Sequence, residues 1–163
     1  MTDFLGTVAG VGRFTLAFNL INSIRHLETD AAMLEHLAQT ARALAPGGVY
    51  AVGLSTSAHG LEMASEDVWT ARRGRVSVTQ SVQYLPPGSA RSRVERVVSH
   101  VHVETPGGTR HADSAYGLRT YSHAQWHDLI ARSAMRLESV VNERGDAIDA
   151  PECGYAVYVL RPA

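Results

Sequence analysis

The sequence predicts an α/β fold in which a parallel strand–helix–strand unit carries an antiparallel insertion and ends in an antiparallel strand pair. Three observations predict it: two nearly continuous apolar runs flank a helical pattern, alternating segments follow, and the last part returns to a helix and two strands. We expect a single domain over 1–163. In it, 1–54 and 122–163 form the core sheet and 55–121 the insertion.

The first apolar run, 14–20 (FTLAFNL), is typical of a strand buried on both faces, as in parallel sheets. Thr29 is the expected N-cap of the next helix, in which apolar residues recur at helical spacing. The Pro-Gly-Gly stretch at 46–48 is expected to end that helix, and 47–54 (GGVYAVGL) predicts a second buried strand. A strand, a helix and a strand in this order imply a right-handed crossover and a parallel pair.

The insertion contains two segments, 75–85 and 91–104, in which apolar and polar residues alternate. This period of two predicts antiparallel strands with one solvent-facing side. Stretches rich in Pro and Gly at 86–88 and 106–108 are the predicted turns.

The last part of the chain begins with a capping box, because Gln125 follows Ser122 by three residues. The helix that it starts is predicted to continue to about Ala134. Two further apolar segments, 136–143 and 153–160, predict strands that pair antiparallel and complete the sheet.

Composition limits the classes of partner. The net charge is −1 and no block of Lys or Arg occurs, which excludes an electrostatic preference for nucleic acid or an anionic membrane. Cys153 is the single cysteine, so an intramolecular disulfide and a Cys-based zinc site are excluded. Without an apolar signal segment or a run of roughly 20 apolar residues, we expect a cytoplasmic protein.

Three segments together resemble the class I S-adenosylmethionine-dependent methyltransferases of the small-molecule branch. They are 14–27 (FTLAFNLINSIRHL), 37–54 (LAQTARALAPGGVYAVGL) and 118–122 (LRTYS). The loop within the first segment matches the Asn-Ser-x-x-His-Leu form of glycine N-methyltransferase and the amino-sugar N,N-dimethyltransferases, although Thr15 stands where the family usually has Asp. The resemblance implies a partial Rossmann-like sheet, S-adenosylmethionine as cofactor, and methyl transfer to a nitrogen or oxygen atom of a small molecule.

The resemblance does not include the strands and the Gly-rich loop that hold most of the cofactor in the family. The chain opens Met1-Thr2-Asp3-Phe4, similar to the second part of the family's adenine-binding stretch, Asp-Met-x-x-Phe. We therefore expect a truncated domain with weak cofactor affinity, whose first strand is an exposed sheet edge open to homodimer formation. The alternative is a catalytically incompetent fragment that acts as a binding or oligomerisation module. A third interpretation, a small β-barrel-like binding protein, requires that 14–54 form no strand–helix–strand unit.

Ligands of open α/β sheets bind beyond the carboxyl ends of strands, which is where the first predicted strand ends. There the resemblance implies contacts to the methionine part of the cofactor. The predicted cofactor-binding residues are Met1, Asp3, Phe4, Asn19, Leu20, Ile21 and His26. Methyl transfer needs little acid–base chemistry because the sulfonium carbon is already electrophilic, so His26 or solvent takes the acceptor's proton. The alternative roles are loop capping for Asn22 and a core position for His26.

The family's insertion forms a lid over the methyl acceptor. The predicted substrate-binding residues are Asn22, Trp69, Tyr84, Tyr116 and Arg119, in which aromatic rings shape a pocket and the guanidinium binds a carboxylate or carbonyl. The alternative is core packing for the aromatic rings and a structural ion pair for Arg119.

Three histidines of the insertion form a further pattern. His100 and His102 share a strand face by alternation, and His111 can approach from the neighbouring strand. Three imidazoles can bind zinc. No acidic residue accompanies them in the sequence pattern, so we predict no metal site.

Overall fold

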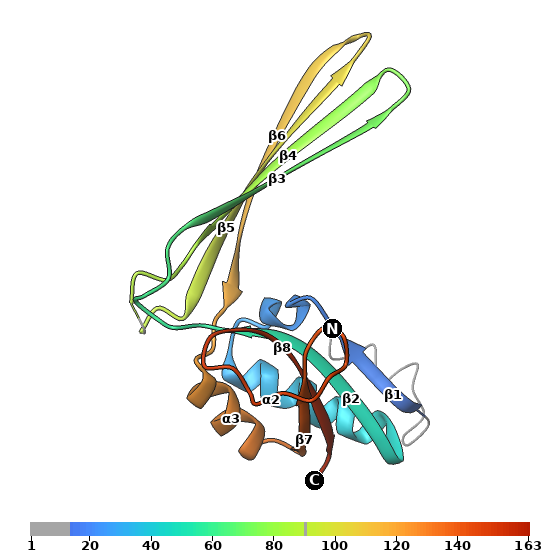
Figure 1. Ribbon diagram of the computed structural model, residues 1–163, viewed down its shortest axis with the longest axis vertical. Helices are drawn as coiled ribbons and strands as arrows, with labels where there is room; N and C mark the ends of the chain where they lie inside the picture. The colour runs from blue at the N-terminus through green and yellow to red at the C-terminus, as the bar shows by residue number, and fades with distance from the viewer. Residues whose placement is uncertain (1–13, 90) are drawn as a thin grey trace. The chain divides into compact units, whose positions relative to one another are not determined.

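The computed structural model describes residues 14–89 and 91–163, and the chain divides into two compact units (Figure 1). The first unit comprises Met1–Ala58 and Arg119–Ala163, and the second is His59–Leu118. Each unit holds a four-stranded sheet.

The sheet of the first unit combines parallel and antiparallel pairs. Its strands lie in the order β1 (Phe14–Asn19), β2 (Leu44–Thr56), β8 (Gly154–Pro162) and β7 (Met135–Val141). β1 runs parallel to β2, while β8 is antiparallel to both β2 and β7. The predicted α/β fold class, with its parallel strand–helix–strand unit and its C-terminal antiparallel pair, is confirmed. The β-barrel-like interpretation is wrong because β1 and β2 are parallel and joined by a helix.

The edge strand β1 is exposed, so the prediction that 14–20 is buried on both faces is wrong. The exposed fractions are 44% for Phe14, 55% for Leu16 and 70% for Phe18. Within the described residues β1 pairs with β2 alone. A run of apolar residues indicates that a strand can be buried on both faces. The pattern cannot indicate whether other elements cover those faces.

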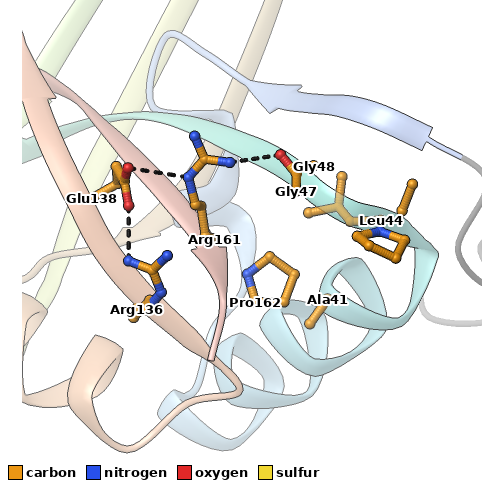
Figure 2. Close-up of a pocket in the computed structure, with 10 residues that line it drawn as sticks. Ala41, Leu44, Gly47, Gly48, Arg136, Glu138, Arg161 and Pro162 are labelled. Atoms are coloured by element: carbon orange, nitrogen blue, oxygen red, sulfur yellow. Dashed lines mark hydrogen bonds and ion pairs between the residues drawn. The ribbon is translucent and has the colours of Figure 1, made fainter.

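β2 begins three residues before the predicted start at Gly47, and the helix ends before the Pro-Gly-Gly stretch expected to end it. The helix ends at Ala43 and β2 begins at Leu44, so the Pro-Gly-Gly stretch lies inside the strand, where the register against β1 shifts. Gly47 has a φ of +79°, which a glycine adopts without strain, and such residues are tolerated at a bulge. The Arg161 guanidinium donates to the Gly47 carbonyl at 2.6 Å (Figure 2).

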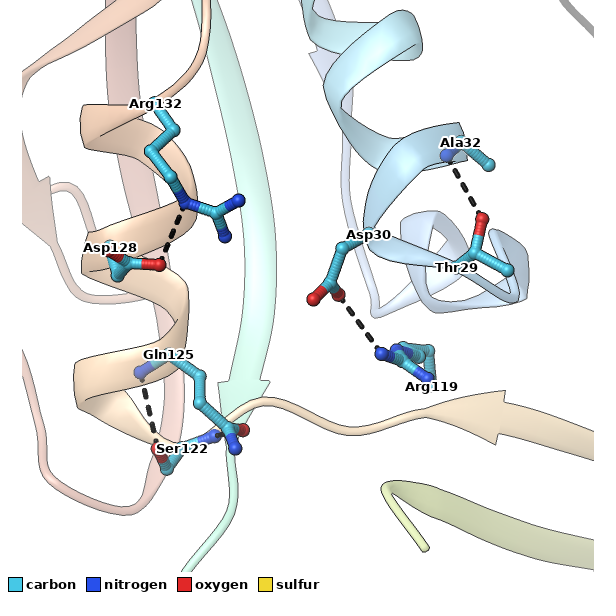
Figure 3. A network of polar contacts seen from close by, with 8 residues as sticks. All are labelled: Thr29, Asp30, Ala32, Arg119, Ser122, Gln125, Asp128 and Arg132. Atoms are coloured by element: carbon cyan, nitrogen blue, oxygen red, sulfur yellow. Dashed lines mark hydrogen bonds and ion pairs between the residues drawn. The ribbon is translucent and has the colours of Figure 1, made fainter. Parts of the chain in front are cut away.

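Three helical segments of the described residues accompany this sheet: η1 (Ser23–His26), α2 (Asp30–Ala43) and α3 (His123–Ala131). Both predicted N-caps are confirmed (Figure 3). Thr29 Oγ1 accepts from the Ala32 amide at 3.1 Å, and Ser122 and Gln125 form the reciprocal capping box. α3 ends three residues before the predicted Ala134.

The core of the first unit is built on four large aromatic residues, Tyr50, Tyr121, Trp126 and Tyr158, all fully buried. Trp126 makes edge-to-face contacts with Tyr121 and Tyr158, at ring-centroid distances of 5.6 and 5.8 Å. Helix α2 contacts β2, β7 and β8, while α3 contacts β7. Burial of these rings fixes the sheet against its helices and thereby the position of the loops at its edges.

The second unit is a sheet of four consecutive strands, β3 (Ser65–Arg73), β4 (Val76–Leu85), β5 (Val94–Thr105) and β6 (Gly108–Arg119). β3–β4 and β4–β5 are antiparallel, which confirms the strands predicted at 75–85 and 91–104. β3 and β6 were not predicted individually, because both are exposed almost throughout and lack a clear apolar alternation. The buried cluster of this unit is small: Val82, Val97 and Leu118, with Tyr84 beside it.

Candidate functional site

The chain makes a strained turn where β1 ends. Ile21 has a φ of 58° and Asn22 a φ of 61°, so two successive non-glycine residues occupy the left-handed region. This conformation is costly for a β-branched residue such as Ile21. Ile21 is 82% exposed, which means that burial of its side chain does not offset the strain. Retained strain of this kind is typical of sites where a backbone must present its polar groups to a ligand.

Asn22 ties this turn to the carboxyl end of β2. Its Oδ1 accepts from the Ser55 amide at 2.6 Å, and its Nδ2 donates to Ser55 Oγ at 3.0 Å. The Asn22 amide also donates to the Gly53 carbonyl at 3.1 Å. The Asn22 side chain therefore joins the loop to β2, and it does not cap η1.

Gly53 and Tyr155 both lie in close contact with the backbone of the turn. A Cβ at Gly53 would overlap the Tyr155 hydroxyl and lie 3.1 Å from the Ile21 nitrogen. The Tyr155 hydroxyl accepts from the Ile21 amide at 3.5 Å. Sequence reasoning missed Gly53, Ser55 and Tyr155. The one signal was a glycine inside an apolar strand, which often marks a close approach of backbone.

Asn19 is the last residue of β1, and its Oδ1 is buried without a donor among the described residues. A buried acceptor without a partner costs about 1–3 kcal/mol. Asn19 therefore supplies an acceptor at the carboxyl end of the strand that suits an amino group.

The other residues predicted at this edge lie on the surface. Leu20 is exposed, and His26 is exposed at the end of η1, so the alternative of a core histidine is wrong. The neighbouring Arg25 is buried instead, and its Nε donates to the Arg119 carbonyl at 2.9 Å. The predicted contacts Met1, Asp3 and Phe4 lie outside the described residues.

Arg119 has a structural partner in the first unit. Its Nη2 lies 3.1 Å from Asp30 Oδ1, at the first residue of α2, and its side chain is only 18% exposed (Figure 3). The structure thus places the guanidinium in an ion pair within the first unit, with the first residue of α2.

The three aromatic residues predicted to line a substrate pocket belong to the second unit. Trp69 on β3 and Tyr116 on β6 are exposed, while Tyr84 on β4 is half-buried. Desolvation raises the pKa of the Tyr84 hydroxyl, and the nearby Asp67, Tyr116 and Glu95 act in the same direction.

An apolar groove of about 490 Å³ is lined by residues of β1, α2 and the start of β2, and Asn19 is one of them. Phe14, Leu16 and Phe18 line one side. On the other side His36 Nε2 lies 2.7 Å from the Tyr50 hydroxyl. Burial lowers the pKa of His36 and raises that of Tyr50, so both groups are neutral.

A second cavity, of about 530 Å³, surrounds the bulge of β2 (Figure 2). There Glu138 bridges Arg136 at 2.8 Å and Arg161 at 3.2 Å. The hydrogen bond from Arg136 is the main cause of a lowered Glu138 pKa. Because both guanidiniums share one carboxylate and the cavity adjoins the start of β2, we assign this network to sheet stability.

Within residues 14–89 and 91–163, no group of three or more His, Cys, Asp or Glu side chains is arranged to hold a metal ion. No helix in that part of the chain is long and apolar enough to cross a membrane.

No protein-family model matches the chain, and no curated protein matches its sequence. Solved structures do share its fold. DesVI from Streptomyces venezuelae is 23% identical, with a TM-score of 0.68, over 93% of this chain and 59% of that one. The sugar N-methyltransferase KedS8 from a Streptoalloteichus species is 20% identical, with a TM-score of 0.69, over 94% and 59% of the two chains.

A third similar structure is CalS10 with S-adenosylmethionine bound, an amino pentose methyltransferase from Micromonospora echinaspora. It is 19% identical, with a TM-score of 0.67, over 95% of this chain and 61% of that one. The Rossmann-like methyltransferase fold that the resemblance implied is therefore confirmed. The chain spans about 60% of the length of these structures.

Proposed function

We propose that this chain takes part in the transfer of a methyl group from S-adenosylmethionine to a nitrogen or oxygen atom of a small molecule. The observation that carries the proposal is the parallel β1–β2 pair, whose carboxyl ends bear the strained turn at Ile21 and Asn22. Ligands of open α/β sheets bind at such an edge. The fold shared with methyltransferases supports the same assignment.

The residues at this edge fit the methionine part of the cofactor. Asn19 Oδ1 offers a buried acceptor that lacks a donor among the described residues. Leu20 and Ile21 are exposed, and the left-handed conformation of Ile21 fixes the direction of its backbone polar groups. S-adenosylmethionine supplies an electrophilic methyl group on its sulfonium when bound. The protein's contribution is to hold the acceptor in line with that group and to exclude water.

His26 is the proposed base, since it is exposed four residues after the turn. For the acceptor we propose an amine on a sugar, because two of the similar structures are a sugar N-methyltransferase and an amino pentose methyltransferase. The acceptor contacts that we propose within the second unit are Trp69, Tyr84 and Tyr116.

Calorimetric titration of the chain with S-adenosylmethionine and S-adenosylhomocysteine tests the cofactor assignment. We expect binding that weakens at least tenfold in Asn19→Leu, which removes a hydrogen bond worth about 1.4 kcal/mol. Asn142→Ala is the matched control, because that asparagine lies in the loop between β7 and β8. No heat at millimolar ligand would exclude cofactor binding by this chain.

Transfer of a labelled methyl group to amino sugars tests the role of His26. If His26 takes the acceptor's proton, His26→Asn lowers kcat by about 10²–10⁴-fold, whereas His123→Asn on α3 leaves it unchanged. A loss smaller than threefold in His26→Asn assigns the proton to solvent.

One observation favours a second candidate function, a non-catalytic module that self-associates through β1. Exposed Phe14, Leu16 and Phe18 lie on an edge strand whose outer side pairs with no described residue, beside the apolar groove. Such an edge readily pairs with another chain. Analytical ultracentrifugation tests this: a dimer that dissociates in Phe18→Lys but not in Val94→Lys supports it, and a monomer at high micromolar concentration refutes it.

A further inference from the structure

We propose that His100 and His111, in the second unit, form a binding site for a divalent transition-metal ion, with Asp113 as the carboxylate that orients His100. This site is independent of the proposed methyl transfer. It rests on the distances among these three side chains, which come from the neighbouring strands β5 and β6.

Two imidazole nitrogens face each other at the spacing that one ion requires. His111 Nδ1 lies 3.2 Å from His100 Nε2. Two nitrogens that each lie about 2.0–2.1 Å from a metal ion are about 2.8–3.0 Å apart in octahedral geometry and about 3.3–3.4 Å apart in tetrahedral geometry. The two rings are tilted by 33°, with centroids 5.3 Å apart, so they are not stacked on each other. An ion therefore fits between the two nitrogens with little movement of either ring.

Asp113 prepares His100 as a ligand. Its Oδ1 lies 2.5 Å from His100 Nδ1, and this carboxylate holds the ring proton on that nitrogen. The lone pair of Nε2 is then directed at His111. A metal-bound histidine in proteins usually has such a carboxylate on its other nitrogen, which fixes the tautomer and strengthens the ligand. The sequence pattern concealed this acidic partner, because Asp113 lies on the other strand.

His102 is close but is placed to pack, not to ligate. Its ring is stacked on His111 at 4.7 Å with an interplanar angle of 5°. Lone pairs of imidazole lie in the ring plane, so two parallel rings direct their nitrogens past a common ion. The site thus has two protein ligands, in agreement with the absence of a three-ligand group among the described residues.

The chemistry of the two ligands selects the class of metal. Neutral imidazole suits Cu²⁺, Ni²⁺ and Zn²⁺, and affinity among divalent ions rises toward Cu²⁺. The exposed position of His100 leaves the remaining coordination positions to water. Mg²⁺ and Ca²⁺ require oxygen ligands and are not expected to bind.

Titration calorimetry of the full chain with Ni²⁺ and Zn²⁺ tests the proposal, with Mg²⁺ as the negative ion. We expect at least tenfold weaker Ni²⁺ binding in His100→Asn and in His111→Asn. Asp113→Asn should weaken binding about 10–100-fold, because it removes the carboxylate that orients His100. His102→Asn is the matched control on the same face of the sheet, and a change smaller than threefold is expected there.

Electron paramagnetic resonance of the Cu²⁺ form adds a readout of the ligands themselves. We expect coupling to two imidazole nitrogens, reduced to one in His111→Asn. Equal Ni²⁺ affinity in His111→Asn and the unmodified chain would overturn the proposal, and so would an equal loss in His102→Asn. Far-UV circular dichroism of each variant checks that the sheet is intact. If the 3.2 Å contact is only a hydrogen bond between two imidazoles, the binding of Ni²⁺, Zn²⁺ and Cu²⁺ will not depend on His111.

Discussion

Substitution of Asn22 tests the left-handed turn on which the candidate site depends. Two variants separate the contributions: Asn22→Gly removes the side chain but keeps access to positive φ, whereas Asn22→Ala removes the same contacts and adds a backbone penalty. Both variants remove the oxygen that accepts from the Ser55 backbone amide and the nitrogen that donates to the Ser55 hydroxyl.

The expected magnitudes follow from burial and backbone geometry. Ser55 is half-buried, so the loss of the acceptor for its amide costs about 1–2 kcal/mol in Asn22→Gly. At a φ of 61°, the Cβ of alanine adds strain that glycine avoids. Glycine also has the greater chain entropy when unfolded, so the net extra cost in Asn22→Ala is about 1 kcal/mol. We expect Asn22→Ala to be about 2–3 kcal/mol less stable than the unmodified chain.

Urea unfolding followed by Trp126 fluorescence measures both values. The chain has two tryptophans, so a Trp69→Phe background leaves Trp126, which is fully buried in the first unit, as the only reporter. Ser55→Ala serves as the partial control, because it removes only the hydroxyl that accepts from Asn22 Nδ2. An Ala variant as stable as the Gly variant would refute a left-handed Asn22, and two variants as stable as the unmodified chain would refute the Ser55 contacts.

Three further predictions concern stability. Burial lowers the pKa of His36 from its ordinary value of 6.5, so the unfolded chain binds a proton that the folded protein does not, and the free energy of unfolding falls as the pH drops below about 6.5. His36→Gln should flatten that dependence in urea midpoints measured on both sides of this pH; an unchanged slope would contradict the assignment. Asp30→Asn should lower the free energy of unfolding by about 1–2 kcal/mol, because it removes the charged partner of the mostly buried Arg119 guanidinium. A double-mutant cycle with Arg119→Met should give a coupling energy of about 1 kcal/mol, and a coupling of zero would contradict the ion pair. Thr29→Ala should cost about 1 kcal/mol through loss of the α2 cap, and Thr29→Asp should restore it in thermal melts.

Local features were predictable because the residues that cause them are neighbours in the chain. The caps at Thr29 and Ser122 lie next to the helices that they start, and both are present as predicted. The parallel β1–β2 pair followed from two apolar runs joined by a helix, since such a connection allows few topologies.

The composition of the candidate site was only partly predictable. The sequence located the turn after 14–20 and named Asn22. It could not indicate that Ser55, 33 residues later, would form hydrogen bonds with both the oxygen and the nitrogen of the Asn22 side-chain amide. The hydroxyl of Tyr155 reaches Ile21 across 134 residues. Contacts at such separations depend on strand order and register, which no short pattern encodes.

By itself the sequence determined most of the strands and helices, that the chain is α/β, and which methyltransferase fold it resembles, because hydrophobic period and capping chemistry act over a few residues. Only the tertiary structure decided that β1 is exposed, that Arg119 pairs with Asp30, and that Asp113 meets His100. Those outcomes depend on which elements lie side by side in space, and side chains far apart in the chain meet only after the sheets have set their register.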